Sequence, residues 1–453
     1  MQYAIQILLS SLSPLAFYLL YRSINLYVIR RRLIRFHQCL PPAIYPLNPF
    51  LFGLDFLLDS LRAAKSKTYL QRIQHLYHNY GNTFTLQSSP FSPPTINTIE
   101  PANIKTILTT NFGDYTAGES RRKSFTPLLG RSIFLSDGVE WAQSRALLRP
   151  SFARSQIADM PHLEMHVRNL IYAIRVDGET VIDLAELFLR FAADVITDLM
   201  FGKSILSLSH PESFDAKFMT AFQRAQDGGE ARFRMGIFAD WVPGQGRFWE
   251  SVKWVHEFMD KHVDDAMRSR EEAKQQASYS SNNNDSEGPK GRYIFLQEIA
   301  KISDDRKLLR DELLTILFAG RDSTAATLTN LVFELSRRPD VWQRLRQEVT
   351  QKLQGVPPSF SQLKEIEYLH DCVNETLRLY PVIPVNSRVA KRPTILPVGG
   401  GPDGKSPVFV PKGSVVAYHV HAMQRSSDLW GEDAAEFNPD RWASEEKSSV
   451  GSV

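Results

Sequence analysis

Apolar residues recur at helical spacing from Asp304 to Arg338, and this pattern predicts one helix about 50 Å long at a rise of 1.5 Å per residue. The middle of that helix, Ala319 to Thr324, is unusual for a buried element because it contains a glycine, an acid and two hydroxyls. A glycine inside a helix costs roughly 1 kcal/mol relative to alanine, and short polar side chains compete for backbone hydrogen bonds. The pattern therefore indicates either a long packing helix with a kink, or a helix that widens locally and presents a proton-handling group to a bound molecule.

A second apolar run covers Ala4 to Tyr21 without a charged residue, continues after Arg22 to Ile29, and ends at a basic cluster between residues 30 and 35. A run of this length predicts a transmembrane helix, and the positive-inside rule places the basic cluster in the cytosol. A cleaved signal peptide is the alternative, although no charged residue precedes the apolar run. We expect a membrane anchor over residues 1–29, a proline-rich connector over residues 30–50 and one large cytosolic domain over residues 51–453.

Residues 138–150 open a predicted helix on which Trp141 and Arg145 are four residues apart and therefore share a face. An indole N–H and a guanidinium that project together make a suitable pair of donors for an anion. The alternative is an ordinary amphipathic helix with a solvated arginine.

A later helix ends at Pro381 and places Glu375 and Arg378 three residues apart on one face. If the two side chains are buried, they need each other and further hydrogen bonds, because an unpaired buried charge is very costly. If they are exposed, the pair contributes less than about 1 kcal/mol. The pattern leaves both arrangements open.

Short runs of strand-forming residues follow this helix, at residues 387–390, 407–413 and 415–418. Turn residues separate the runs, and they predict a small sheet in an otherwise helical protein. Residues 154–270 have a helical pattern with short breaks, whereas the polar stretch from Gln275 to Arg292 predicts a surface loop.

Length and charge narrow the classes of function. The chain has 453 residues, of which 43% are hydrophobic, and it can bury a large core. Lysine and arginine exceed aspartate and glutamate by only 53 to 50, and the net charge of +3 gives no basis for binding nucleic acid. Cys39 and Cys372 are too few for a disulfide framework and match no zinc or redox spacing, so we expect the bulk of the chain in a reducing compartment.

These motifs, together with the stretch Glu436 to Trp442, resemble in order and spacing those of the cytochrome P-450 superfamily of haem-thiolate monooxygenases. The resemblance covers nearly the whole chain. It implies a mainly α-helical cytochrome P-450 fold with small β-sheets, and haem (heme, iron protoporphyrin) as the cofactor. It also implies that the central helix crosses the haem, with Ala319 and Gly320 forming the groove for oxygen.

The same resemblance assigns a proton-delivering acid and alcohol to the central helix. By position these are Asp322 and Ser323, with Thr324 next to them. Most members carry a threonine where this chain has Ser323, which keeps the hydroxyl.

The resemblance also assigns residues around the haem. Trp141 and Arg145 match residues that hold a haem propionate, and Arg388 lies near another such contact. The family's structural charge network on the proximal side of the haem corresponds to Glu375, Arg378 and Arg441. We therefore expect one flat cavity to be bordered by four residues together: Ala319, Asp322, Trp141 and Arg388.

One branch of the family is more similar than the others. The stretch Ser144 to Arg154, the window in the central helix and the stretch Leu396 to Gly404 look like those of the fungal alkane and fatty-acid hydroxylases. That likeness implies oxidation of a lipophilic substrate in the endoplasmic reticulum membrane. It also implies that electrons pass from NADPH through a membrane-bound NADPH-cytochrome P-450 reductase.

One feature departs from the family pattern. The family places its axial cysteine in a loop beyond the Phe437 to Trp442 stretch, followed by a further helix, and this sequence ends at Val453. Neither Cys39 nor Cys372 is in that position. The expectation is a chain that is truncated before the cysteine loop and has no metal ligand of its own, although an axial thiolate is what favours O–O cleavage.

Two hypotheses about function follow. In the first, the chain is a member of a monooxygenase family and oxidises C–H bonds. In the second, it is a truncated non-catalytic relic or a membrane-tethered interaction protein. An unrelated helical membrane enzyme is a third possibility, but it requires all these motifs to coincide in order.

Overall fold

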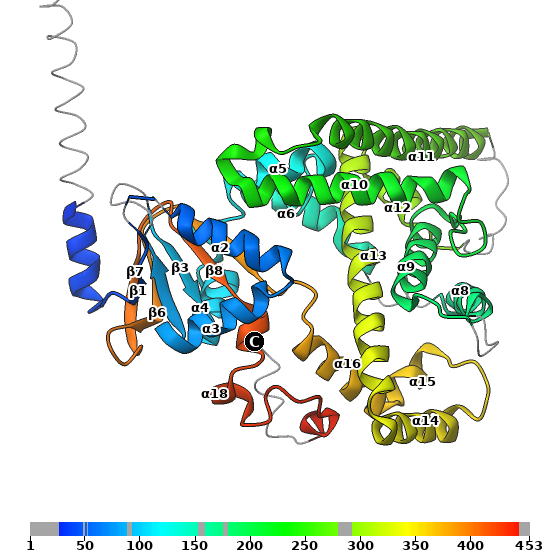
Figure 1. Cartoon of the computed structure of the whole chain (residues 1–453). Helices are drawn as coiled ribbons and strands as arrows, with labels where there is room; N and C mark the ends of the chain where they lie inside the picture. Colours follow the sequence, from blue (N-terminus) through cyan, green and yellow to red (C-terminus); the bar gives the residue numbers. More distant parts are fainter. Residues whose placement is uncertain are drawn as a thin grey trace, which may run out of the picture. The chain divides into compact units, whose positions relative to one another are not determined.

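The computed structural model describes residues 27–48, 50–51, 53–87, 93–152, 159–174, 180–279 and 292–443. The chain divides into two compact units (Figure 1). The sheet unit contains described residues up to Thr116 and from Ile383 to Ala435. The helical unit contains Ala117 to Val382 and the described residues from Glu436 onward.

A six-stranded sheet with the order β1-β2-β3-β8-β5-β4 forms the centre of the sheet unit. Two of its pairings, β1 with β2 and β3 with β8, are parallel, and the others are antiparallel. A separate antiparallel pair consists of β6 and β7. The strands have these bounds: β1 Ala43–Tyr45, β2 Thr83–Leu86, β3 Thr95–Thr98, β4 Tyr115–Thr116, β5 Asn386–Ala390, β6 Thr394–Gly400, β7 Ser406–Val410 and β8 Val415–Tyr418.

The strands predicted after residue 386 are therefore confirmed, but they belong to two sheets instead of one. Strands β1 to β4 were not predicted, because they are short and mix polar with apolar residues, and β6 was not predicted either. One of them, β1, lies inside the predicted connector over residues 30–50 and pairs with β2. The connector is therefore in part a strand of the sheet.

Short helices accompany the sheet, and one of them, α3, packs its apolar face against the strands. Ile73, Leu76 and Tyr77 of α3 pack against Phe84 of β2 and Tyr418 of β8. Residues 27–36 are also helical. The other helices of this unit have these bounds: α2 Leu54–Lys65, α3 Tyr69–Tyr80, α4 Pro101–Lys105, α17 Val420–Met423 and α18 Ser427–Trp430, with a π-helical turn at Thr106–Thr110 and a 3-10 turn at Phe112–Asp114.

The helical unit is built around α13, and α9 packs along it. Helices α10 and α11 lie side by side (Figure 1). The helices have these bounds: α5 Glu119–Leu129, α6 Gly138–Leu148, α8 Met160–Ala173, α9 Leu184–Phe201, α10 Phe214–Met235, α11 Gln245–Tyr279, α12 Phe295–Ile302, α13 Arg306–Ser336, α14 Pro339–Leu353, α15 Phe360–Glu365 and α16 Glu367–Leu379. Short 3-10 turns cover Arg149–Phe152, Gly236–Trp241 and Pro439–Trp442.

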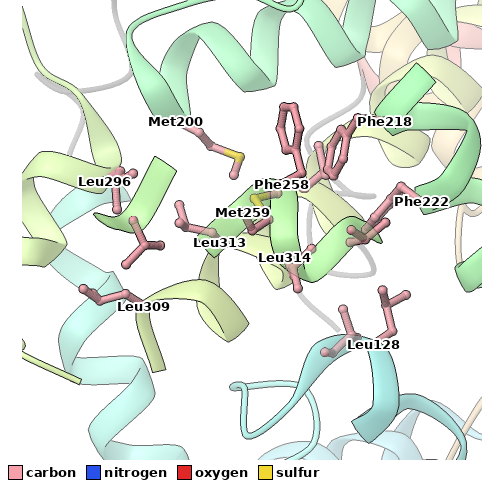
Figure 2. Close-up of a cluster of buried hydrophobic side chains, with 14 of the residues drawn as sticks. Leu128, Met200, Phe218, Phe222, Phe258, Met259, Leu296, Leu309, Leu313 and Leu314 are labelled. Atoms are coloured by element: carbon pink, nitrogen blue, oxygen red, sulfur yellow. The ribbon is translucent and has the colours of Figure 1, made fainter. Parts of the chain in front are cut away.

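The main core of the helical unit forms where six helices converge on the N-terminal half of α13. Figure 2 shows this cluster. Its labelled members are Leu309, Leu313 and Leu314 of α13, Phe218 and Phe222 of α10, Phe258 and Met259 of α11, Met200 of α9, Leu128 of α5 and Leu296 of α12. Apolar burial on this scale fixes α13 against its neighbours, because each fully buried side chain of this size contributes about 1.5–3 kcal/mol.

Helix α13 confirms the predicted central helix and corrects one detail. It runs from Arg306 to Ser336 without interruption, and the local widening expected at Ala319 to Thr324 does not appear as a break. The Asp305 carboxylate caps its first turn by accepting from the backbone N–H groups of Lys307 and Leu308. The Ser323 hydroxyl is accommodated because it donates back along the helix to the Ala319 carbonyl.

Two other predictions meet the structure only in part. Helix α11 continues to Tyr279, so the loop predicted from Gln275 begins later than expected. The rest of that loop, residues 280–291, lies outside the described residues. Residues 1–26, which carry most of the predicted membrane anchor, also lie outside them. Among the helices that the structure describes, none is both long and apolar enough to cross a membrane.

Candidate functional site

The middle of α13 presents small side chains on one face. Ala319 and Thr324 are exposed, and Ser323 is half-buried. Ser323 lies one turn beyond Ala319, and its Oγ donates to the Ala319 carbonyl at 2.6 Å. Because a hydroxyl keeps two lone pairs after donating, Ser323 can still accept a hydrogen bond from a group bound against this face.

Asp322 lies about 100° around the helix from Ser323 and contacts α10. Its Oδ2 accepts a hydrogen bond from Nε2 of Gln226 at 2.6 Å. Its Oδ1 lies 3.1 Å from Nε of Arg321, as an ion pair. The side chain of Asp322 is 30% exposed, so it has access to solvent while it contacts both partners.

Gly320 is explained by helix packing. A Cβ at this position would lie 2.9 Å from Cδ1 of Ile196, on α9. The glycine therefore allows α13 and α9 to approach closely. The groove for oxygen at Ala319 and Gly320 stays a prediction.

On α6, the guanidinium carbon of Arg145 lies 5.2 Å from the centre of the Trp141 ring. Arg145 is exposed and Trp141 is half-buried, so both predicted donors share one accessible face. Ser144, which lies between them on α6, is buried and close enough to the Glu312 carboxyl of α13 to lower its pKa, although burial raises that pKa overall. This contact connects α6 directly to the central helix.

Glu375 is the centre of a fully buried charge network. Its carboxylate accepts from Nε and Nη2 of Arg378, both at 2.8 Å, and from Nε of Arg441 at 3.0 Å. Trp442 adds its indole N–H at 3.0 Å, and Asn438 adds its backbone N–H at 2.9 Å. The structure thus brings together the three residues predicted for the network and selects the buried alternative.

The partners of Glu375 keep its carboxyl ionised. Burial raises the pKa of Glu375, but the hydrogen bonds from Arg378 and Asn438 and the charge of Arg378 outweigh it, and the pKa lies below its usual value. Arg378 also donates to the Glu436 carbonyl at 2.9 Å. The network therefore fastens the segment from Glu436 to Trp442 onto α16.

Arg388 lies on β5, in the sheet unit. Its Nη1 donates to the Ser387 carbonyl at 3.0 Å, and the side chain is half-buried. The other three residues expected around the flat cavity are in the helical unit. The cavity bordered by all four stays a prediction.

The two cysteines are not arranged as iron ligands. Cys372 lies on α16 with no exposed surface, packed in a cluster with Leu335 and Tyr368. Burial raises the pKa of its thiol to about 12, and burial also raises the pKa of Cys39. Both are therefore thiols at neutral pH, whereas a metal ligand must be a thiolate.

The described groups match haem only in part. The Trp141 and Arg145 donors on α6 suit the carboxylates at the rim of a porphyrin. The axial thiolate does not come from a described residue, and no cluster of three or more metal-ligating side chains occurs within the described ranges. The described residues thus fit the rim of the cofactor and not its axial position.

Three residues near these groups were missed from the sequence: Gln226, Arg321 and Trp442. Gln226 did carry a signal, because it follows Phe222 by four residues on the buried face of α10. A polar residue in such a stripe needs a buried partner.

Comparisons with known proteins identify the family. The family model "Cytochrome P-450" matches residues 49–453. The cytochrome P-450 monooxygenase himC of Aspergillus japonicus is 43% identical over 407 residues, which are 90% of this chain and 72% of that protein. The cytochrome P-450 monooxygenase fsdH of Fusarium heterosporum is 39% identical over 422 residues, 93% of this chain and 73% of the relative. Cytochrome P-450 52A3-A of Candida maltosa is 38% identical over 414 residues, 88% of this chain and 77% of the relative.

The mainly helical architecture with two small sheets agrees with this match. The family model also spans the segments that contain the α13 window, the Trp141–Arg145 pair and the Glu375 network. The chain therefore belongs to the cytochrome P-450 monooxygenase family, a family of oxidoreductases.

Proposed function

We propose that this protein is a membrane-bound, haem-dependent monooxygenase that oxidises C–H bonds of a lipophilic substrate with O2 and electrons from NADPH. The observation that carries the proposal is the middle of α13, where an exposed face of small residues at Ala319 and Ser323 adjoins the Asp322 carboxylate. When bound, haem would supply the activation of oxygen. The residues of α13 would supply protons and space.

The proton-handling roles follow from the contacts. The Asp322 carboxylate is partly exposed and can exchange a proton with solvent. The Ser323 hydroxyl donates to the Ala319 carbonyl and keeps acceptor capacity toward the exposed face. We assign Asp322 and Ser323, with the exposed hydroxyl residue Thr324, to proton delivery.

On α6, we assign Trp141 and Arg145 to binding a propionate of the haem, and Arg388 to a second such contact. The charge on Arg145 and its exposed position support this role. Glu375, Arg378 and Arg441 would act by holding the segment before residue 443 in place, since they are buried and reach no solvent.

For the substrate, we propose an alkane, a fatty acid or a related lipophilic metabolite. The support is the likeness to the fungal alkane and fatty-acid hydroxylases at Ser144 to Arg154, in the α13 window and at Leu396 to Gly404. Function is a property of the site more than of the fold, and this likeness lies partly in the site.

We place the protein in the endoplasmic reticulum membrane, with residues 1–29 as a single-pass anchor and the main domain in the cytosol. The support is the uncharged apolar run before the basic cluster at residues 30–35. A membrane-bound NADPH-cytochrome P-450 reductase would then be the electron donor.

The experiment supplies membranes containing the protein with the reductase, NADPH and a panel of n-alkanes and fatty acids. The ratio of oxidised product to NADPH consumed is measured for the parent and for Ser323→Ala with Thr324→Ala. The expected result is product from the parent and a lower ratio in the variant, because protons reach the site less efficiently. Thr327→Ala is the control, since its hydroxyl bonds to the Ser323 carbonyl one turn along the same helix.

A second candidate function rests on the cysteines. Because burial raises the pKa of both described cysteine thiols, the second candidate is a non-catalytic relic or a membrane-tethered interaction protein. That function predicts no product from any member of the panel. Product that depends on both NADPH and O2 would exclude it.

A further inference from the structure

Gln226 of α10 is a buried polar residue that contacts the proposed acid of α13. It is 7% exposed, and it sits among apolar residues of the same helix, including Phe222 and Ala225. Its Nε2 donates to Oδ2 of Asp322 at 2.6 Å. Both helices belong to the helical unit. A buried amide at this position is costly unless it is hydrogen-bonded, and Asp322 is the group that receives its N–H.

A second glutamine on α10, Gln223, donates to Oδ1 of Asp227 at 2.8 Å and has a different partner on α13. Gln223 lies three residues earlier and accepts from Nη2 of Arg321, which is 5% exposed. The two glutamines therefore divide the adjacent charges of α13 between them. Gln223 contacts the guanidinium, and Gln226 contacts the carboxylate.

The chemistry of the amide suits a group that gains and loses a proton. An ionised Asp322 only accepts, and the NH2 group of Gln226 donates to it, as observed. A protonated Asp322 has an O–H to donate, and Oε1 of Gln226 is a carbonyl acceptor. This Oε1 is buried and has no hydrogen-bond partner among the described residues. A lysine or arginine in place of Gln226 would instead favour the ionised carboxylate alone.

We propose that Gln226 is a positioning residue, which holds the Asp322 side chain against α10 and accommodates it both with and without its proton. This inference rests on the proposed role of Asp322 in proton delivery. The new element is that α10 fixes the position of the Asp322 carboxylate. Asp322 lies about 100° around α13 from Ser323.

Two substitutions on α10 form a matched test. Gln226→Glu places a carboxylate against Asp322, and Gln223→Glu places one against Arg321. The midpoint of thermal unfolding of the full chain is measured for each between about pH 5 and pH 8, relative to the parent at the same pH. Other ionisable groups nearby are Glu230 of α10, Glu186 of α9 and Asp227 of α10, whose Oδ1 accepts from Nε2 of Gln223 at 2.8 Å. Because Gln223→Glu would also meet Asp227, parent and variants all carry Asp227→Asn in this comparison.

The two variants are expected to change in opposite directions. In Gln226→Glu, two carboxyls share one proton at low pH and repel each other when both ionise, so its midpoint falls relative to the parent as pH rises. In Gln223→Glu, ionisation creates an ion pair with Arg321, so its midpoint rises relative to the parent. Asp322→Asn in the Gln226→Glu background should remove most of the fall, which separates repulsion from the cost of burying a charge.

The same sign of change in both variants would overturn the proposal, as would a fall that persists undiminished with Asp322→Asn. If Gln226→Glu does not fold, Gln226→Met replaces it, because methionine keeps the length and loses both hydrogen bonds. It should lower the midpoint when Asp322 is present and have a clearly smaller effect with Asp322→Ala. Equal effects in both backgrounds would contradict the contact.

These measurements do not involve haem or turnover. A protein that forms no product but shows the opposite pH responses would refute the proposed function and keep the contact. A protein that forms product but shows identical responses would keep the function and refute the role of Gln226.

Discussion

At the scale of single residues, Glu375 shows how one buried carboxylate can organise distant parts of the chain. It receives hydrogen bonds from α16 and from three residues of the segment 438–442. Two arginines and an indole N–H leave no lone pair of this carboxylate without a donor nearby. Such a group stabilises the fold only as a complete set, because removing one partner leaves an uncompensated buried charge.

Arg378→Ala should therefore lower the free energy of unfolding by roughly 3–5 kcal/mol and abolish haem incorporation, because the segment from Glu436 to Trp442 loses its attachment. Urea unfolding and the haem content of purified protein measure the two effects. Arg268→Ala is the control, since its ion pair with Asp265 has the same i, i+3 spacing but is exposed and should contribute at most about 1 kcal/mol. Normal haem content in Arg378→Ala would contradict this role.

His419 and Tyr77 form a buried pair in the sheet unit, with the Tyr77 hydroxyl 2.5 Å from Nδ1 of His419. Burial lowers the pKa of His419 to about 4, and it lowers the pKa of His421 to about 4 as well. The folded pKa of each is below the unfolded value of about 6.5, so the unfolded state binds more protons between these values. Stability must fall as pH drops from about 6.5 to 4.

His419→Asn should make this pH dependence of the unfolding free energy shallower, by an amount on the order of 3 kcal/mol over that range. Urea unfolding at a series of pH values tests it. Tyr77→Phe should lower stability and keep the slope, because burial causes the shift in pKa and not the hydroxyl. An unchanged slope in His419→Asn would show that this histidine is not the titrating group.

At the scale of elements, α13 is positioned by buried acids as well as by its apolar core. Asp311 and Glu312 have no exposed surface and accept backbone N–H groups of the loop after α5, from Arg131 at 2.9 Å and Ile133 at 3.4 Å. That loop leads into α6, which carries Trp141 and Arg145. The two helices that contain the predicted proton and propionate residues are therefore fastened to each other.

Gly130 makes this attachment possible, and its substitution is a test. Its φ is +56°, and a Cβ there would overlap the Asp311 carboxylate. Gly236 has the same φ with open space around it, so Gly236→Ala should cost only the backbone strain, about 1–3 kcal/mol. Gly130→Ala should destabilise by clearly more than that in urea unfolding, because the buried acid must move. Equal costs for the two variants would refute the contact with Asp311.

At the scale of the whole molecule, the sequence predicted the elements that carry local signals. Helix α16 is clearly amphipathic and is closely followed by Pro381, and α13 is a long run of helix-forming residues without a proline. The strands β1 to β4 carry weak signals, since they consist of two to four residues stabilised by partners distant in sequence. In the candidate site, too, contacts within one helix were predictable and contacts between helices were not. Glu375 and Arg378 were predictable as neighbours on one helix, whereas the partner of Asp322 was not.

The partner of Asp322 was not predictable because the contact joins residues 96 positions apart. Helical spacing describes one helix at a time, and it says nothing about which face of α10 meets α13. Gly130 is a similar case, because its need for glycine comes from a carboxylate on another helix. The family resemblance supplied the identity of the acid and the alcohol, but not the groups that hold them.

The central proposal is that this protein is a haem-dependent monooxygenase, although neither described cysteine is placed as an axial ligand. The most direct measurement is the carbon monoxide difference spectrum of reduced membranes that contain the full chain, recorded with its haem content. The proposal predicts bound haem and a carbon monoxide band in the Soret region. A flat trace from protein with confirmed haem loading would contradict it.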